Sequence, residues 1–221
     1  MRPLRLVLLV CAVGLVATGS ALADHQDPQK RITAADQARG RAMLVKRSDL
    51  TAGFRREAPS NEPDPHIDCP SSVSEADLTQ TGDVEGPGFT RGLVTLTSAA
   101  QLYESVADAS ASWRRNTSAA GIECLRDLAR REFATGDLRF VSLRKISFPR
   151  VAQRTVAFRI VLSGKVQQQT IKVYGDVVVL MHSRAHAQVT AITPLQPFPR
   201  ADLVALARVV SGRMARAMRG G

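Results

Sequence analysis

Residues 155–193 have the sequence TVAFRIVLSGKVQQQTIKVYGDVVVLMHSRAHAQVTAIT, which carries the strongest pattern in the chain. Every second residue from Val156 to Leu162 is apolar, which is the alternation of a strand with one buried face. Two short polar segments then interrupt the apolar pattern, and their composition favours tight turns. The pattern therefore predicts an antiparallel meander: strands over 155–163, 166–182 and 188–193, with turns at 163–165 and 183–185.

The flanking sequence adds helices and further strands to this meander. Thr33 can cap a helix, and Gly86-Pro87-Gly88 is typical of a turn between two strands. The apolar stripe of the helical region at 105–133 rotates near 116–121, which predicts a kink or break there. The expected elements are a helix at 34–46, strands at 76–84 and 89–98, the helical region at 105–133, a strand at 138–146, and a helix at 202–218. The order α-β-β-α-β-β-β-β-α predicts an α+β fold, with helices packed on an antiparallel sheet of about five to six strands.

Composition limits the classes of function. The chain has 221 residues, of which 44% are hydrophobic and 23% charged, as in a soluble globular protein. Aromatic residues make up only 5%, so a binding platform of stacked rings is not expected. No cofactor motif is present, and no zinc finger, helix-turn-helix or RNA-binding signature indicates sequence-specific nucleic-acid recognition.

The first residues have the pattern of a secretion signal. Arg2 and Arg5 precede an apolar run of 12 residues, Leu6–Ala17, which is too short to span a bilayer. Ala21-Leu22-Ala23 then forms a cleavage site, so we expect cleavage after Ala23, against the alternative of an uncleaved anchor. No later segment is apolar enough for an anchor. The predicted organisation is a signal peptide at 1–23, a flexible mature N-terminus at 24–32, and one α+β domain at 33–221, secreted and extracytoplasmic.

Signal removal leaves two cysteines, Cys69 and Cys124. In an oxidising compartment the simplest expectation is one disulfide between them. It would close a loop of 55 residues and contribute about 4 kcal/mol in a chain-entropy treatment. A thiol nucleophile and a metal-binding pair are the alternatives, but neither cysteine has the spacing of a CxxC site.

Several motifs together resemble a known group of proteins. These are the Ser-Asp-Leu-x-x-Gly-aromatic turn at Ser48–Phe54, the proline-rich loop ending in Cys69, and Ala-Ser-Trp-Arg-Arg at 111–115 followed by Cys124. The arrangement is similar to small secreted proteins of actinobacteria. It distantly resembles PsbP-like lipoproteins and the extracellular sensor domains of mycobacterial receptor Ser/Thr kinases. The resemblance implies a fold and a compartment, and it carries over no catalytic residue. The kinase sensor domains have two disulfides, whereas this chain can form one.

His182 and His186 are the best candidates for a metal site, though weak ones. A three-residue turn between two strands would place them opposite one another, with Cβ atoms about 5 Å apart. No third ligand lies nearby in the sequence, so both histidines are more simply explained as flanking a hairpin tip. No Gly-x-Ser-x-Gly motif is present, and an enzyme is the less favoured interpretation.

Charge is the remaining feature with functional content. The formal net charge is +10, and removing the signal with its two arginines leaves +8. Such a balance favours polyanionic partners, such as anionic lipid headgroups or cell-wall polymers, although arginine-rich composition alone could also explain it. The sequence predicts a non-catalytic binding or sensor-like module for a small ligand, lipid or anionic envelope component. The alternatives are an extracytoplasmic hydrolase and an accessory or interaction protein of the cell envelope.

Overall fold

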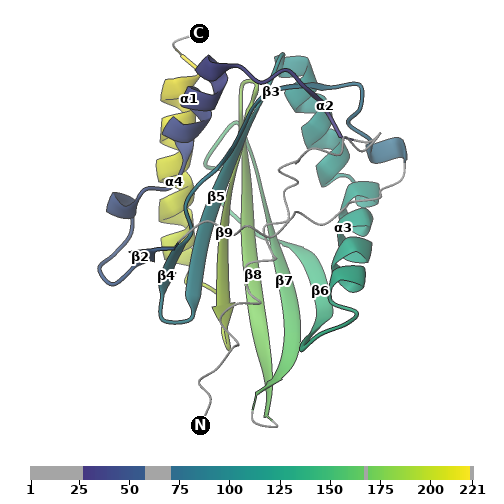
Figure 1. Cartoon of the computed structure of the whole chain (residues 1–221), viewed down its shortest axis with the longest axis vertical. Coiled ribbons are helices and arrows are strands. Elements are labelled where there is room, and N and C mark those ends of the chain that lie inside the picture. Colours follow the sequence, from purple (N-terminus) through teal and green to yellow (C-terminus); the bar gives the residue numbers. More distant parts are fainter. Residues whose placement is uncertain (1–26, 58–70, 167–168, 220–221) are drawn as a thin grey trace.

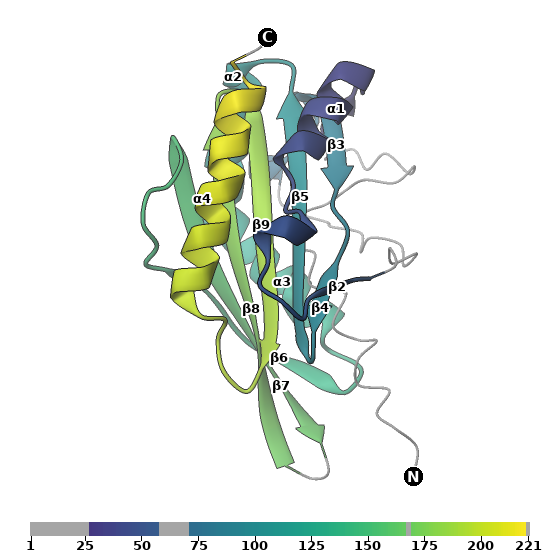
Figure 2. The same cartoon turned by 90° about the vertical axis from the view of Figure 1, so that its left-hand side faces the viewer.

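The computed structural model describes residues 27–57, 71–166 and 169–219, which form three layers. A central sheet lies between two pairs of helices, and Figures 1 and 2 show one pair on each face. The helices are α1 (Ala34–Met43), α2 (Val106–Thr117), α3 (Ala119–Glu132) and α4 (Arg200–Ala217), with short 3-10 turns η3 (Arg47–Asp49) and η4 (Ser71–Val73). The described strands are β1 (Gln29–Lys30), β2 (Arg55–Arg56), β3 (Thr79–Glu85), β4 (Phe89–Arg91), β5 (Val94–Tyr103), β6 (Leu138–Ile146), β7 (Arg154–Val166), β8 (Gln169–His182) and β9 (Ala185–Pro194).

These nine described strands form a single open sheet in the order β1-β3-β5-β9-β8-β7-β6. The short strand β4 pairs with β5 and with β2 beside the main path. All pairings are antiparallel except β1 with β3, which is parallel, so the sheet is mixed. The α+β class predicted from the sequence is confirmed. The expectation of five to six antiparallel strands was wrong in its count and order, because short edge strands carry too little pattern to be recognised.

Strand β1 lies within 24–32, the segment that the sequence predicts to be flexible. Backbone hydrogen bonds of 2.8 Å from Gln29 N to Leu78 O and of 2.9 Å from Arg31 N to Gln80 O tie this segment to β3. A two-residue strand has no periodicity, and its partner is almost fifty residues away, so local sequence gives no signal of it. The proposed signal peptide, 1–23, lies outside the described residues.

The strand expected over 89–98 is in fact a hairpin. Gly92 has a φ of +61°, which L-residues rarely adopt, and it forms with Leu93 the two-residue turn between β4 and β5. The register pairs Arg91 with Val94 across this turn. Apolar and polar residues alternate on both sides of Gly92, so the sequence pattern alone predicts one continuous strand there.

The turn expected at 163–165 is also misplaced, because β7 continues through Gly164 to Val166. A Cβ atom on Gly164 would lie 2.7 Å from Leu138 Cδ2 and 2.9 Å from Asp137 O. The glycine therefore permits the close approach of β6 to β7 and does not form a turn. The connection between β7 and β8 falls at 167–168, outside the described residues.

The break predicted in the helical region at 105–133 is confirmed at Ser118. This residue ends α2 and begins α3, and its Oγ accepts a hydrogen bond of 3.0 Å from Gly121 N while donating one of 2.7 Å to Arg115 O. Its side chain thus satisfies one open group of each helix. Thr33 caps α1 through a hydrogen bond from Asp36 N, as the sequence predicts, and Ser105 caps α2 through one from Asp108 N.

Apolar packing divides between the two faces of the sheet. The largest cluster lies under α1 and α4 and includes Leu96, Leu102, Val178, Leu180 and Val210. On the opposite face, α3 covers one apolar cluster with β6 and β7, and α2 covers a smaller one with β5 and β8. The second face, the α2–α3 face, also carries the polar side chains from which a site can be built.

Candidate functional site

A row of polar side chains from β9 lies on the α2–α3 face: His186, Gln188 and Thr190. On one side these residues pair, in the same order, with Gln101, Ala99 and Thr97 of β5. On the other side they pair with Met181, Val179 and Val177 of β8. All three β9 side chains are buried, whereas the β5 side chains beside them are half-buried. We call these three residues the β9 polar row.

His186 joins the sheet to α2. Its Nε2 lies 2.9 Å from the carbonyl oxygen of Ala109 in α2, and its ring packs against Tyr103 and Trp113 with centroid separations of 5.1 and 5.8 Å. Burial lowers the pKa of His186 to about 4, so the ring is neutral at neutral pH. Nε2 therefore carries the proton and donates to the carbonyl, which assigns this histidine a structural contact.

The predicted pairing of His182 with His186 was wrong. The turn has two residues, Ser183 and Arg184, instead of three, and Ser183 takes a φ of +54°. His182 therefore pairs with Ala185, while His186 pairs with Met181. Because a one-residue change of register moves a side chain to the other face of the sheet, the two histidines point away from each other. Across the described residues, no three His, Cys, Asp or Glu side chains gather so that they could hold a metal ion.

Gln188 is the least satisfied member of the β9 polar row. Its side-chain nitrogen donates a 2.9 Å hydrogen bond to Thr190 Oγ1, but Oε1 is buried and has no partner in the described part of the chain. The residue as a whole is 6% exposed. Leaving a buried carbonyl oxygen without a hydrogen bond costs about 1–3 kcal/mol, so this oxygen is a place where a bound donor would be favoured.

A second buried polar group without a partner lies on the same face, at the end where β3 pairs with Tyr103. Gln80 of β3 pairs in register with Tyr103, is 1% exposed, and its Nε2 has no hydrogen-bond partner among the described residues. The α2–α3 face thus offers one open acceptor, on Gln188, and one open donor, on Gln80. Neither group could be predicted from the sequence, because a glutamine in a strand reveals neither its burial nor its partners.

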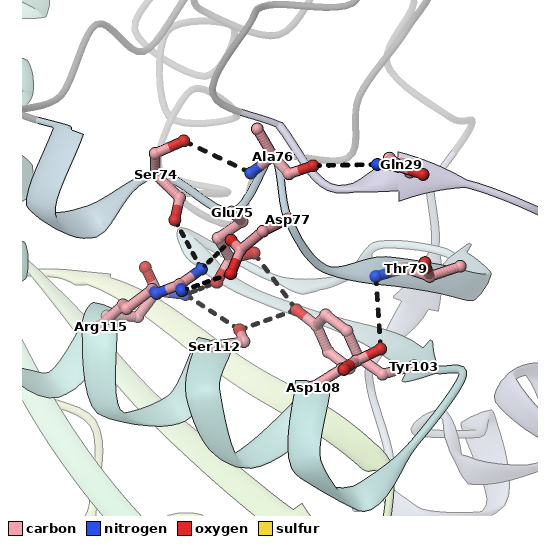
Figure 3. A network of polar contacts seen from close by, with 11 residues as sticks. Gln29, Ser74, Glu75, Ala76, Asp77, Thr79, Tyr103, Asp108, Ser112 and Arg115 are labelled. Carbon is pink, nitrogen blue, oxygen red and sulfur yellow. Dashed lines mark hydrogen bonds and ion pairs between the residues drawn. The ribbon is translucent and has the colours of Figure 1, made fainter.

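A larger polar network surrounds Tyr103, and Figure 3 shows it between α2 and the segment before β3. Tyr103 shares a 2.8 Å hydrogen bond with Ser112 Oγ and donates one of 3.4 Å to Glu75 Oε2. Asn116 donates a 2.9 Å hydrogen bond to the other carboxylate oxygen of Glu75. Burial raises the pKa of Glu75, and burial together with the Glu75 carboxylate raises the pKa of Tyr103 well above its ordinary value.

Arg115 completes this network at the surface. Its guanidinium makes two hydrogen bonds to the Asp77 carboxylate, of 2.5 and 2.8 Å, and a third of 2.7 Å to Ser74 O. Together with Glu75, these contacts fasten the segment 74–77 onto α2, as Figure 3 shows. The Trp-Arg-Arg motif that stood out in the sequence thus has a structural role at its second arginine.

The hydrolase alternative requires a nucleophile in contact with a base. Ser112 and His186 both lie near Tyr103, yet Ser112 bonds to Tyr103 and Asn116, and His186 bonds to the Ala109 carbonyl. Among the described residues of this cluster, Ser112 and His186 therefore form no hydrogen bond with each other of the kind a triad uses.

Cys124 lies on α3 and is 5% exposed. Its expected partner, Cys69, falls outside the described residues. The disulfide between Cys69 and Cys124 therefore stays a prediction.

Three arginines form ion pairs with aspartates on the opposite face of the sheet. Arg184 pairs with Asp36 through hydrogen bonds of 2.7 and 2.8 Å, and these bonds hold the pKa of Asp36 well below its ordinary range. Arg213 of α4 donates two hydrogen bonds, of 2.6 and 2.7 Å, to the Asp49 carboxylate. Arg159 lies 2.6 Å from the fully buried Asp176. These three pairs connect α1, η3, α4 and the sheet, so part of the basic composition has a structural explanation.

No family model matches the sequence, and neither does any curated protein. Similar solved structures include the extracellular domain of PknH from Mycobacterium tuberculosis, with 11% identity, a TM-score of 0.48, and coverage of 85% of this chain and 98% of that one. LpqN of the same organism, involved in cell envelope biogenesis, has 10% identity, a TM-score of 0.31, and coverage of 74% and 78%. A Mycobacterium smegmatis ortholog of Rv0999 has 14% identity, a TM-score of 0.37, and coverage of 74% and 92%. The extracellular domain of a mycobacterial kinase, the group that the sequence motifs resemble, is thus among the similar structures.

Proposed function

We propose that this protein is an exported, non-catalytic binding module that holds a small ligand on the α2–α3 face of its sheet. The observation that carries the proposal is the unpartnered Oε1 of Gln188, a buried acceptor in the middle of that face. Export is proposed from the signal-like pattern of residues 1–23. No described helix is both long and apolar enough to cross a membrane.

The surroundings of Gln188 indicate the chemistry of the ligand. Val177 and Val179 of β8 lie beside the β9 polar row, and Phe158 of β7 pairs with Val177 on the same face. On the β5 side, Thr97 and Ala99 are half-buried neighbours. An apolar body over the valines, with one hydroxyl or amide group that donates to Gln188 Oε1, would satisfy this arrangement. A lipid or a small amphipathic metabolite has this character.

The first test is native mass spectrometry of the protein isolated from the exported fraction of its own host. The proposal expects a retained mass besides that of the polypeptide. After that ligand is removed, adding it back should raise the melting temperature. A folded protein that carries nothing, and that shows no thermal shift with panels of lipids and metabolites, would contradict the proposal.

Gln188→Met separates a ligand site from a packing defect. The change removes the buried unpartnered oxygen, so the ligand-free variant should melt at the same temperature as the wild type or higher. Because the acceptor is lost, its affinity for the retained ligand should fall about tenfold, as for the loss of one hydrogen bond. Ser211→Ala is the control: it removes a buried polar side chain of α4, on the opposite face of the sheet, and should leave the affinity unchanged.

A further inference from the structure

One end of the sheet exposes two leucines at the tips of neighbouring turns. Leu195 is 69% exposed and Leu93 is 53% exposed, the two highest values among the exposed large hydrophobic residues of the described chain. The β5–β9 register pairs Thr95 with Ile192, and its continuation brings Leu93 beside Pro194. Figures 1 and 2 show the β4–β5 turn and the end of β9 at the same end of the molecule, opposite the C-terminus of α4.

The backbone at Leu195 is unusual. Its φ is +69°, a left-handed conformation that a leucine rarely adopts, and its amide is held by a 2.7 Å hydrogen bond to Lys172 O. A glycine or an asparagine would fit this backbone with less strain. The chain thus places an apolar side chain in solvent at a position where both the backbone and the exposure disfavour it. Such a position is expected where the side chain has a function.

Cations border the two leucines. Arg91 precedes the β4–β5 turn, Arg55 lies next to it on β2, and Lys172 lies on β8 beside Leu195. All three are exposed, and none of them forms an ion pair with a described carboxylate. Arg91 instead stacks on the ring of Phe54 at 4.7 Å. The first acid that follows β2 in the sequence, Glu57, lies two residues beyond Arg55 and pairs with Gly88, further from the turn. We call Arg55, Arg91, Leu93, Lys172 and Leu195 the basic leucine end.

From these observations we infer that the basic leucine end docks on an anionic lipid bilayer. The two leucines enter the boundary between headgroups and acyl chains, where exposed apolar side chains are stabilised. Arg55, Arg91 and Lys172 then lie at the depth of the lipid phosphates, which attract them electrostatically. Lys and Arg suit this position because their long aliphatic stems follow the apolar boundary while their charges stay in water. This inference does not depend on the ligand proposed on the α2–α3 face.

The test is co-sedimentation of the mature protein with vesicles of phosphatidylcholine, with and without phosphatidylglycerol. We expect binding that needs phosphatidylglycerol and that weakens as salt is raised. Combining Leu93→Asn with Leu195→Asn should lower the partition coefficient about tenfold or more, because two apolar contacts are lost. The melting temperature of this variant should be equal or higher, since asparagine tolerates the left-handed backbone at 195. Reduced binding therefore could not be attributed to unfolding.

Two controls keep the result specific. Val106→Ser with Val141→Ser removes residues of 52% and 51% exposure on other surfaces and should leave binding unchanged. Arg55→Gln with Lys172→Gln should weaken binding to vesicles with phosphatidylglycerol roughly twenty-five-fold, about fivefold for each charge. The inference is overturned if the wild type does not bind the vesicles, or if the leucine variant binds them with the affinity of the wild type. It is also overturned if dextran sulfate, a soluble polyanion, binds equally well to the wild type and the leucine variant and displaces the vesicles, because the site would then recognise charge alone.

Discussion

Asp176 is fully buried beneath α4, where hydrogen bonds from two neighbours stabilise its carboxylate. Arg159 supplies a charged hydrogen bond at 2.6 Å, and the backbone amide of Phe198 donates another at 3.2 Å. A carboxylate can be buried only when its charge is compensated in this way, so removing Arg159 would leave an uncompensated charge in the core. The same logic applies to Asp36 with Arg184 and to Asp49 with Arg213. At the scale of single residues, these three aspartates determine where Arg159, Arg184 and Arg213 must lie.

His186 gives a prediction about pH. Its pKa is about 4 in the folded protein and about 6.5 when unfolded, so the unfolded chain takes up its proton first as the pH falls. Folding stability should therefore decrease as the pH is lowered from about 6.5 to about 4, by roughly 3 kcal/mol in total. Glu75, whose pKa is raised by burial, acts in the opposite direction, but it does so equally in a variant that changes only His186.

His186→Gln isolates this effect, because glutamine can still donate to the Ala109 carbonyl but cannot titrate. Urea unfolding of both proteins at several pH values between 7 and 4 should show the steeper decline in the wild type. Parallel declines in the two proteins would mean that His186 is protonated equally easily in the folded state and would contradict the assignment of a buried neutral ring.

At this scale, the sequence revealed residue types but not their partners. Thr33 could be predicted as a cap because a cap acts on an amide only three residues away. The sequence could not predict the burial of Gln188, Gln80 and His186, because that burial depends on strands and helices that are distant along the chain. The β9 polar row is visible only once the register between β8 and β9 is known.

Elements were predicted best where their pattern was long and local. The bounds of β6 agree with the sequence, and the break between α2 and α3 was predicted from a rotating apolar stripe. Turns were less reliable because glycine has two uses: Gly92 forms a turn, whereas Gly164 makes room for Leu138. The difference lies in the neighbouring strand and cannot be detected in the segment itself. A misjudged turn also caused the error at His182, since turn length sets which face a strand residue occupies.

The predicted disulfide acts on one element, the loop that contains Cys69. Cys124 is buried on α3, so a bridge would fix that loop to a packed helix. Cys69→Ser should lower the melting temperature by several degrees, a loss of a few kcal/mol, with the sheet still folded. Peptide mapping of the unreduced mature protein should find Cys69 linked to Cys124. Two thiols that react with an alkylating reagent in protein fresh from the exported fraction would show this prediction to be wrong and would favour thiol chemistry instead.

The whole molecule combines short-range and long-range pairings. Strands β6, β7, β8 and β9 follow one another along the chain and pair as neighbours, whereas β5 pairs with β9 across 97 residues, from Thr95 to Ile192. Closing the longer loop costs more conformational entropy, so we expect it to form later. Pulsed hydrogen exchange during refolding should find amides of β7 and β8 protected before those of β5. Simultaneous protection of all three strands would contradict this order.

This pairing of β5 with β9 has a consequence for biogenesis. A polypeptide that crosses a membrane threaded from its N-terminus delivers β3, β4 and β5 long before β9 follows. During that interval β5 exposes an open hydrogen-bonding edge and the apolar side chains Leu96 and Leu102, which are buried in the finished fold. An open apolar strand edge is a surface on which chains aggregate. If the protein is exported as proposed, its secretion depends on how quickly the last hundred residues arrive, or on a chaperone that shields β5 until they do.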